Sequence, residues 1–177
     1  MSIYDITLTN NEGAAVSLEL YKDKVLMVIN IPFNTGSTAQ FKKLDELYAN
    51  YKDMGFEILA VQTDEFDIKL FGSEHKFSFP LFSKTKVRGE GQHELYKHLT
   101  QAAPDSFGTF YSQAKRAFIK RGLDEGNDSD VMWNFEKFVI NKKGDVVKRF
   151  ATEILADDTR LIEVIDREVA NHATQSA

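Results

Sequence analysis

The chain has 177 residues and a net charge of −5, with 42% hydrophobic and 12% aromatic residues. It is long enough to bury a core as a single domain over residues 1–177 without disulfides or a structural metal. The acidic balance argues against nucleic-acid and acidic-membrane partners, because no basic excess exists to neutralise phosphates. We see neither a membrane-spanning run nor a secretory signal, so we expect a cytoplasmic protein without membrane contact.

The sequence contains no cysteine, which excludes disulfides, zinc–thiolate sites and thiol redox chemistry together. Its four histidines show no metal-ligand spacing. Asp64, Glu65 and Asp67 suggest a site for a hard cation, but three acids near a strand end more often form a solvated rim. We therefore expect neither a metal nor a cofactor.

The N-terminal third begins with a predicted β-hairpin. Apolar and polar residues alternate over residues 3–9 and 15–20, and the Asn-Asn-Glu-Gly sequence at 10–13 is typical of a turn. Residues 25–31 are nearly all apolar and rich in branched side chains. This pattern predicts a central strand that is buried on both faces.

A helix and a second central strand should follow. Apolar residues recur at helical spacing from Phe41 to Tyr51, with Thr38 as the N-cap and Gly55 at the end. Residues 56–61 form the next apolar run. Two apolar strands joined by a helix predict a βαβ unit with a parallel strand pair.

The remaining elements alternate between helices and strands. We predict a short helix over residues 67–76, an apolar segment over 77–82, and a helix over 92–100 with His93 at its start. Two strands at 135–140 and 145–150 flank an Asn-Lys-Lys-Gly turn, and a final helix covers residues 157–171 with Asp157 as its cap; these segments complete a ββα ending.

One segment, residues 104–130, stands apart as an insert. Its aromatic residues recur at helical spacing beside basic residues, and an acidic stretch follows at 124–128. It is either a surface helix folded back on the body or an aromatic face that contacts another subunit. We predict that the insert mediates homo-oligomer formation.

The element order resembles the thioredoxin-like fold, an α/β class with a central mixed sheet flanked by helices. Residues 24–41, 56–66, 79–82 and 93–96, together with Trp-Asn-Phe-Glu-Lys-Phe at 133–138, resemble the glutathione peroxidase family. The resemblance runs from about residue 3 to residue 169. It implies a domain in which a turn after the first central strand carries the chemistry.

The resemblance also implies which residues form the site. The peroxidatic cysteine or selenocysteine of the family falls on Thr35, and the family's glutamine falls on Glu65. Its tryptophan and asparagine fall on Trp133 and Asn134, both of which are retained. The resolving cysteine of the thiol-recycling members would lie near residues 71–72, where this chain has none.

The substitution at Thr35 argues against peroxidase chemistry. A thiolate reduces peroxide by accepting oxygen as a sulfenic acid, whereas a threonine hydroxyl neither ionises near neutral pH nor forms a comparable oxidised state. We therefore expect an inactive or severely impaired family member with a binding or regulatory role. Its ligand would be a small hydroperoxide or thiol.

Two alternatives remain open. The protein could be an oxidoreductase of the family type that reduces hydroperoxides with a thiol donor. It could also be a hydrolase, since Thr35 beside the Glu65 carboxylate resembles a nucleophile with a base, and Trp133 and Asn134 could supply donors. A Thr35–Glu65 hydrogen bond would be a stable polar contact in any of these cases.

Overall fold

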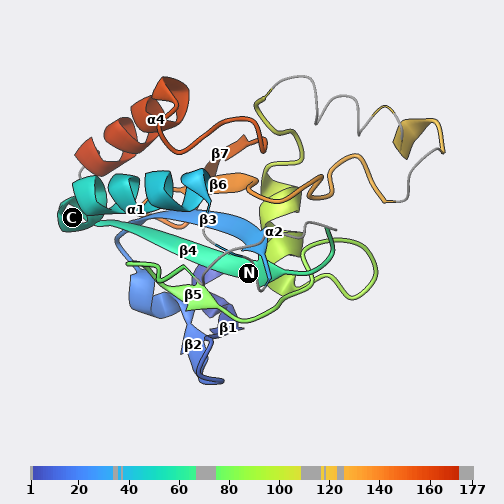
Figure 1. The fold of residues 1–177 in the computed structure, drawn as a ribbon, viewed down its shortest axis with the longest axis horizontal. Helices are drawn as coiled ribbons and strands as arrows, with labels where there is room; N and C mark the ends of the chain where they lie inside the picture. Colours follow the sequence, from blue (N-terminus) through green and yellow to red (C-terminus); the bar gives the residue numbers. More distant parts are fainter. Residues whose placement is uncertain are drawn as a thin grey trace.

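A mixed β-sheet forms the centre of the computed structural model (Figure 1), which describes residues 2–33, 36, 38–66, 75–108, 117, 119–122 and 126–171. Within these residues the sheet has five strands in the order β5-β4-β3-β6-β7. The first three in that order are parallel and the last two antiparallel to their neighbours. Their bounds are β3 Val25–Pro32, β4 Phe56–Thr63, β5 Leu81–Phe82, β6 Lys137–Ile140 and β7 Val146–Phe150. The α/β, thioredoxin-like class is confirmed.

The central strand β3 is buried at all eight positions, as its apolar sequence predicts. Its alternate side chains enter two separate hydrophobic clusters, because successive residues of a strand point to opposite faces. Helices α1 (Ala39–Tyr51) and α4 (Thr159–Ala170) cover one face (Figure 1). Helix α2 (Glu94–Ala102) and the N-terminal segment cover the other.

The predicted hairpin is present but shorter than its apolar alternation suggests. Strands β1 (Thr7–Thr9) and β2 (Ala15–Ser17) pair antiparallel. The flanking segments η1 (Ile3–Asp5) and η2 (Leu18–Tyr21) are 3₁₀ turns, because Ser2 and Ser17 accept hydrogen bonds from backbone N–H groups two residues on. The apolar alternation therefore predicts strands that are too long, because the hydrogen bonds of the two serine side chains hold residues 3–5 and 18–21 in turns.

Helix α1 begins as predicted, with the Thr38 side chain accepting from the Phe41 N–H at 3.3 Å. After a 3₁₀ turn, η3 (Lys52–Met54), Gly55 adopts a φ of 78°, which ends the helix in the left-handed region. His93 caps α2 by accepting from the Leu95 N–H at 3.2 Å. The start of both helices is therefore set by a polar side chain that accepts a backbone N–H of the first turn.

The predicted cap of the last helix was wrong by one residue. Asp158, not Asp157, is the N-cap of α4, and its Oδ1 accepts from the Arg160 N–H at 2.9 Å. Asp157 instead forms an ion pair with Lys43 of α1, with 2.6 Å between Oδ2 and Nζ. Two adjacent acids give the same sequence signal, and the contact with α1 decides between them.

Two predicted segments fall partly outside the described residues. Residues 67–74 of the expected 67–76 helix are among these, and His75 and Lys76 are not helical. The His75 Nε2 lies 2.6 Å from the Asp45 Oδ2 of α1. The proposed insert is described only at 104–108, 117, 119–122 and 126–130. Of these, residues 117, 119 and 120 are helical, whereas Phe107 forms a β-bridge with Phe150 instead, and the rest of the helical pattern remains a prediction.

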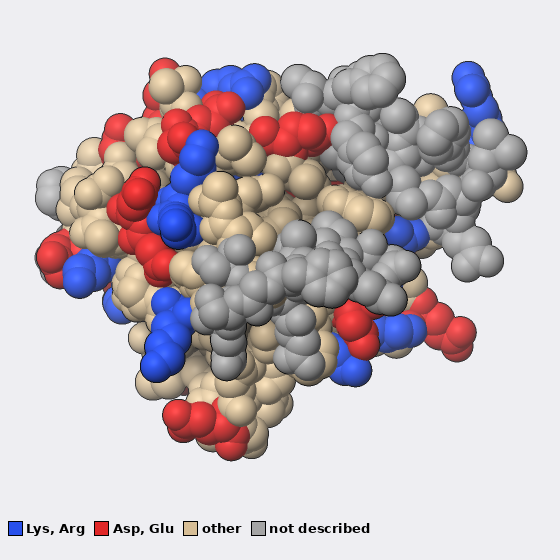
Figure 2. Space-filling model, in the orientation of Figure 1, with Lys and Arg blue, Asp and Glu red and all other residues tan. Residues whose placement is uncertain are grey.

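The surface over α1 and α4 carries acidic and basic side chains intermixed (Figure 2). No helix in the described part of the chain is both long and apolar enough to span a bilayer.

Candidate functional site

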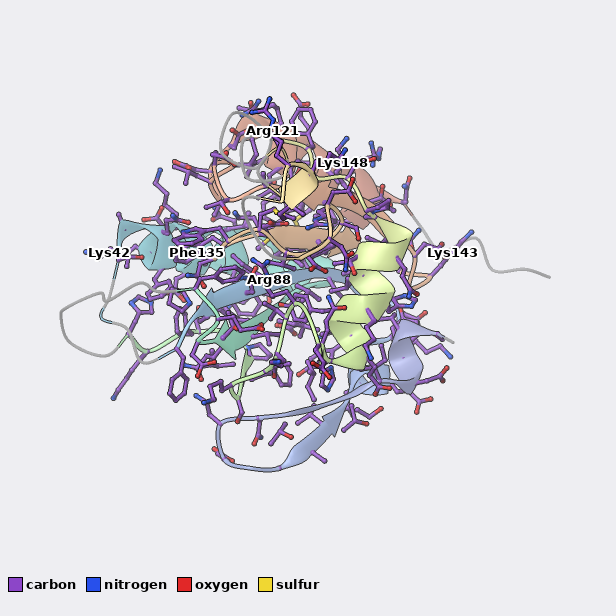
Figure 3. All side chains as sticks on the ribbon, turned by 90° about the vertical axis from the view of Figure 1, so that its right-hand side faces the viewer. Lys42, Arg88, Arg121, Phe135, Lys143 and Lys148 are labelled. Atoms are coloured by element: carbon purple, nitrogen blue, oxygen red, sulfur yellow. The ribbon has the colours of Figure 1, made fainter. Side chains whose placement is uncertain are left out.

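The topology brings three of the four predicted site residues to one end of the sheet. Strands β3 and β4 finish side by side, with the Phe33 N–H donating to the Thr63 carbonyl at 2.8 Å. Glu65 follows β4 directly, and Trp133 and Asn134 precede β6, which enters beside the end of β3. Figure 3 views the molecule from this end. Thr35 lies outside the described residues.

Trp133 is partly exposed and leans on another aromatic residue of the site. Its ring centroid lies 5.4 Å from that of Phe66, with the planes tilted by 48°. Its backbone carbonyl accepts from the Asn30 Nδ2 at 3.0 Å. Because Asn30 belongs to β3 and is fully buried, the sheet fixes the peptide that carries the indole.

Asn134 is fully buried, yet neither atom of its side-chain amide has a hydrogen-bond partner in the described part of the chain. The Oδ1 of Asn30 is in the same state. The Asn134 backbone carbonyl accepts from the Thr152 hydroxyl at 2.9 Å. Buried polar groups are nearly always paired, so an unpaired amide beside an aromatic residue indicates a place where a ligand or water could bind.

Phe135 holds a strained backbone conformation next to Asn134. Its φ is 68°, which is rare for a residue with a side chain and is stabilised here by tertiary contacts. Its N–H donates to the Asn30 carbonyl at 2.7 Å, and its ring lies 5.9 Å from that of Phe41. The sequence carries no signal for this strain, because a phenylalanine in an apolar motif reads as core.

Glu65 is anchored to a loop that sequence reasoning did not connect with the site. Its Oε2 accepts from the backbone N–H groups of Val87 at 2.5 Å and Arg88 at 3.2 Å. A carboxylate is well suited to this role because it only accepts hydrogen bonds. The expected contact with Thr35 lies outside the described residues and stays a prediction.

Behind the site, one buried guanidinium ties several segments together. Arg149 and Glu136 are both fully buried and form a two-point ion pair, with Nε–Oε2 at 2.9 Å and Nη2–Oε2 at 2.8 Å. The other carboxylate oxygen of Glu136 accepts from the Met132 N–H at 2.5 Å. Glu136 thus fixes the residue that immediately precedes Trp133.

The same guanidinium joins the two ends of the insert. Arg149 Nη1 donates to the carbonyls of Ala103 at 3.2 Å, Pro104 at 3.1 Å and Ser129 at 2.7 Å, and Nη2 donates to that of Asp130 at 2.7 Å. Residues 104–130 therefore leave and rejoin the body at one point. No sequence pattern indicates this junction, because Arg149 occupies an ordinary polar position of a predicted strand.

Lys137 is a second buried cation beside the site motif. Desolvation lowers the pKa of its ammonium group to about 7, although Glu136, Glu153 and Asp158 act to raise it. Its Nζ donates to the Phe135 carbonyl at 2.5 Å. Lys137 therefore holds the carbonyl of the strained residue Phe135 by a hydrogen bond. Because it is buried away from water, its positive charge is poorly stabilised.

The acidic residues after β4 do not converge in the described part of the chain, where no group of three or more potential metal ligands is found. Asp64 is exposed and forms an ion pair with Lys84 at 2.9 Å. This hydrogen bond lowers the pKa of the Asp64 carboxyl. Asp67 lies outside the described residues, and Glu65 is directed to the backbone of 87–88.

Comparison with known proteins identifies first the fold class of this chain and then its family. The crystal structure of Trgpx in apo form aligns with a TM-score of 0.74 at 29% identity, covering 97% of each chain. Residues 3–100 match the family described as Glutathione peroxidase. The chain therefore has the thioredoxin-like fold, and it belongs to the glutathione peroxidase family.

Curated relatives extend the match over nearly the whole chain. Thioredoxin/glutathione peroxidase BtuE of Escherichia coli strain K12 is 29% identical over 179 residues, which cover 96% of this chain and 98% of that protein. Glutathione peroxidase homolog BsaA of Staphylococcus epidermidis is 33% identical over 160 residues, covering 85% and 89% respectively. The family resemblance of the sequence is confirmed.

Proposed function

We propose that this chain is a catalytically silent glutathione peroxidase homologue that has kept a binding site. The observation that carries this proposal is the complete absence of cysteine. By resemblance, Thr35 occupies the position of the peroxidatic residue. Its hydroxyl remains protonated near neutral pH and has no oxidised form equivalent to a sulfenic acid.

The state of Glu65 supports the same proposal. A family glutamine can donate a hydrogen bond to a thiolate, whereas a carboxylate cannot donate and raises the pKa of a neighbouring thiol. Glu65 is also engaged by the backbone of Val87 and Arg88. The side chain is thus better suited to holding a loop than to activating a nucleophile.

The retained features favour binding. Trp133 presents part of its ring beside Phe66, and the fully buried amide of Asn134 has a donor and an acceptor without partners among the described residues. A small hydroperoxide or thiol could use both, since it combines an apolar body with one polar group. Such a ligand would be held without being turned over.

The alternative with specific support is the activity of the family, a hydroperoxide reductase using a thiol donor. It is favoured by the similarity to Thioredoxin/glutathione peroxidase BtuE over 96% of this chain. The hydrolase alternative is weaker, because a lone carboxylate is a poor base for an alcohol and Glu65 Oε2 already accepts two N–H groups.

A turnover assay separates the first two functions. Hydroperoxide consumption is measured with glutathione and with reduced thioredoxin, for the natural chain and for Thr35→Ala. We expect both proteins to match the background rate. Turnover by the natural chain well above that of the variant would establish the family activity and end the proposal of a silent site.

A second experiment asks how much of the site geometry is retained. We expect Thr35→Cys with Glu65→Gln to react once with hydrogen peroxide, giving a mass gain of one oxygen at residue 35 on a peptide mass spectrum. Thr35→Cys alone should react more slowly, because the Glu65 carboxylate raises the pKa of the new thiol. No mass gain in either variant would mean that the pocket no longer supports thiolate chemistry.

We also propose that residues 104–130 mediate self-association. The proposal is supported by the convergence of both ends of the insert on Arg149, so that the segment leaves and rejoins the body at one point. Replacing residues 105–128 by a short glycine linker should leave the body folded and lower the mass measured by light scattering. A natural chain that is already monomeric would overturn this.

A further inference from the structure

Arg88 lies at the centre of the end of the molecule that carries the site (Figure 3). Its guanidinium carbon is 5.8 Å from the centroid of the Phe66 ring, a cation–π distance. The Phe66 ring in turn lies 5.4 Å from that of Trp133. Cation, phenyl ring and indole therefore form a series of contacts across the site, with the buried Phe66 ring between Arg88 and Trp133.

The same guanidinium reaches the far end of the insert. A Cβ atom at Gly126 would lie 2.6 Å from Arg88 Nη2 and 3.0 Å from Asp130 Oδ2, so glycine is needed for this close approach. Gly126 also has a φ of 115°, which side chains rarely allow. Asp130 is buried and accepts from the Asn127 N–H at 3.0 Å, which fixes the local turn.

Glu65 holds the base of this connection. Its carboxylate accepts from the Val87 and Arg88 N–H groups, while the Val87 carbonyl accepts from the Gln92 side chain at 3.0 Å. The backbone at 87–88 is therefore fixed on both sides. The direction in which the Arg88 side chain extends from the backbone is therefore also fixed.

We propose that Arg88 is a strut that closes the Phe66 side of the site, and that Glu65 positions it. The strut spans from the 83–91 loop, over Phe66, to the segment 126–130. A molecule approaching Trp133 from this side meets the guanidinium first. This inference concerns access to the site, so it does not depend on whether the site is catalytically silent.

The chain contains a single tryptophan, Trp133, so its fluorescence reports on the site directly. The experiment measures quenching by acrylamide in the full chain. A cation–π contact of about 0.5–1 kcal/mol keeps closed sites about two to five times as frequent as open ones, and Arg88→Ala removes the closed state, so the share of molecules with an open site should rise about three- to sixfold. Quenching should rise accordingly, whereas Arg88→Lys should retain part of the protection.

Lys86→Ala is the matched control, because it removes the same charge from the same loop. The Lys86 ammonium donates to the Glu90 carbonyl and is not part of the aromatic series. We expect its quenching to equal that of the natural chain. Equal increases in Lys86→Ala and Arg88→Ala would reduce the effect to net charge and overturn the proposal.

Two further variants displace the strut without altering Arg88. Glu65→Ala removes the anchor, and Gly126→Ala places a methyl group where the guanidinium lies. Both should raise quenching toward the level of Arg88→Ala, while circular dichroism verifies the fold. Natural-level quenching in folded Arg88→Ala would show that the side chain does not cover the site, and the inference would fail.

Discussion

Two ion pairs, each between a basic and an acidic side chain, lie on either side of the site. They differ in burial and in the number of backbone segments that they connect. Arg149–Glu136 behind the site has both side chains fully buried, whereas Lys84–Asp64 at its front has side chains 51% and 56% exposed. The buried pair joins four backbone segments, and the exposed pair joins two side chains. The backbone behind the site is thus held by several interactions at once, whereas the Lys84–Asp64 pair at the front is an individually weak contact.

The largest expected effect comes from breaking the buried pair. Arg149→Met should lower the free energy of unfolding by about 3–5 kcal/mol, because it leaves the Glu136 carboxylate buried without its cation. Urea denaturation followed by circular dichroism measures the loss. Adding Glu136→Leu should recover part of it, since an apolar pair avoids the desolvation cost. A loss below about 1 kcal/mol would contradict this expectation, because it would equal the small contribution of an exposed ion pair.

A second buried cation, Lys137, should impose a pH dependence. Its pKa is lowered to about 7 in the folded protein, while the unfolded chain keeps a value near 10.5. Between these values the unfolded state binds one proton more, so stability should rise with pH, by up to about 1.4 kcal/mol per unit. Tyrosines oppose this rise only as pH approaches their unfolded pKa of 10.0, because burial raises the pKa of Tyr48 and Tyr51 to about 12 and the unfolded chain then loses those protons first.

The measurement is urea unfolding at intervals from pH 7 to pH 9. Lys137→Met should abolish this rise and should be more stable than the natural chain at pH 7, with the difference shrinking toward pH 9. Lys143→Met, at an exposed position, is the control and should retain the slope. A natural chain with no rise would mean that the Lys137 ammonium is stabilised where it lies.

Between these buried and exposed extremes lies the cap of α4. A hydrogen bond from Arg160 lowers the pKa of Asp158 to about 2, whereas Asp157 meets Lys43 at the surface. Asp158→Ala should destabilise by about 1 kcal/mol at neutral pH, while Asp157→Ala should change stability by less than about 0.5 kcal/mol. The Asp158 contribution should be lost as pH falls through its lowered pKa. Equal losses in thermal unfolding would contradict this assignment.

The same contrast explains what the sequence could predict. Residues 25–31 predict a strand buried on both faces because burial leaves a periodic pattern in the residues themselves. The positions of Trp133 and Asn134 follow from a motif. Glu65 accepts hydrogen bonds from Val87 and Arg88, which lie 22 and 23 residues further along the chain. The partners of Arg149, at 103–104 and 129–130, lie 19 to 46 residues before it. No local sequence pattern encodes contacts between residues so far apart in the chain.

The smallest expected effect belongs to the exposed pair at the front. A double-mutant cycle with Lys84→Ala and Asp64→Ala should give a coupling energy of about 0.2–1 kcal/mol at low salt, because both side chains remain solvated. It should decline further when salt is raised, since the Debye length falls from about 10 Å at 0.1 M to about 3 Å at 1 M. Lys84 also lies 5.6 Å from the Phe33 ring, so Lys84→Ala alone should cost slightly more than Asp64→Ala. A coupling that persists at high salt would mean that the front of the site is as rigid as the back, and the contrast between the two pairs would no longer hold.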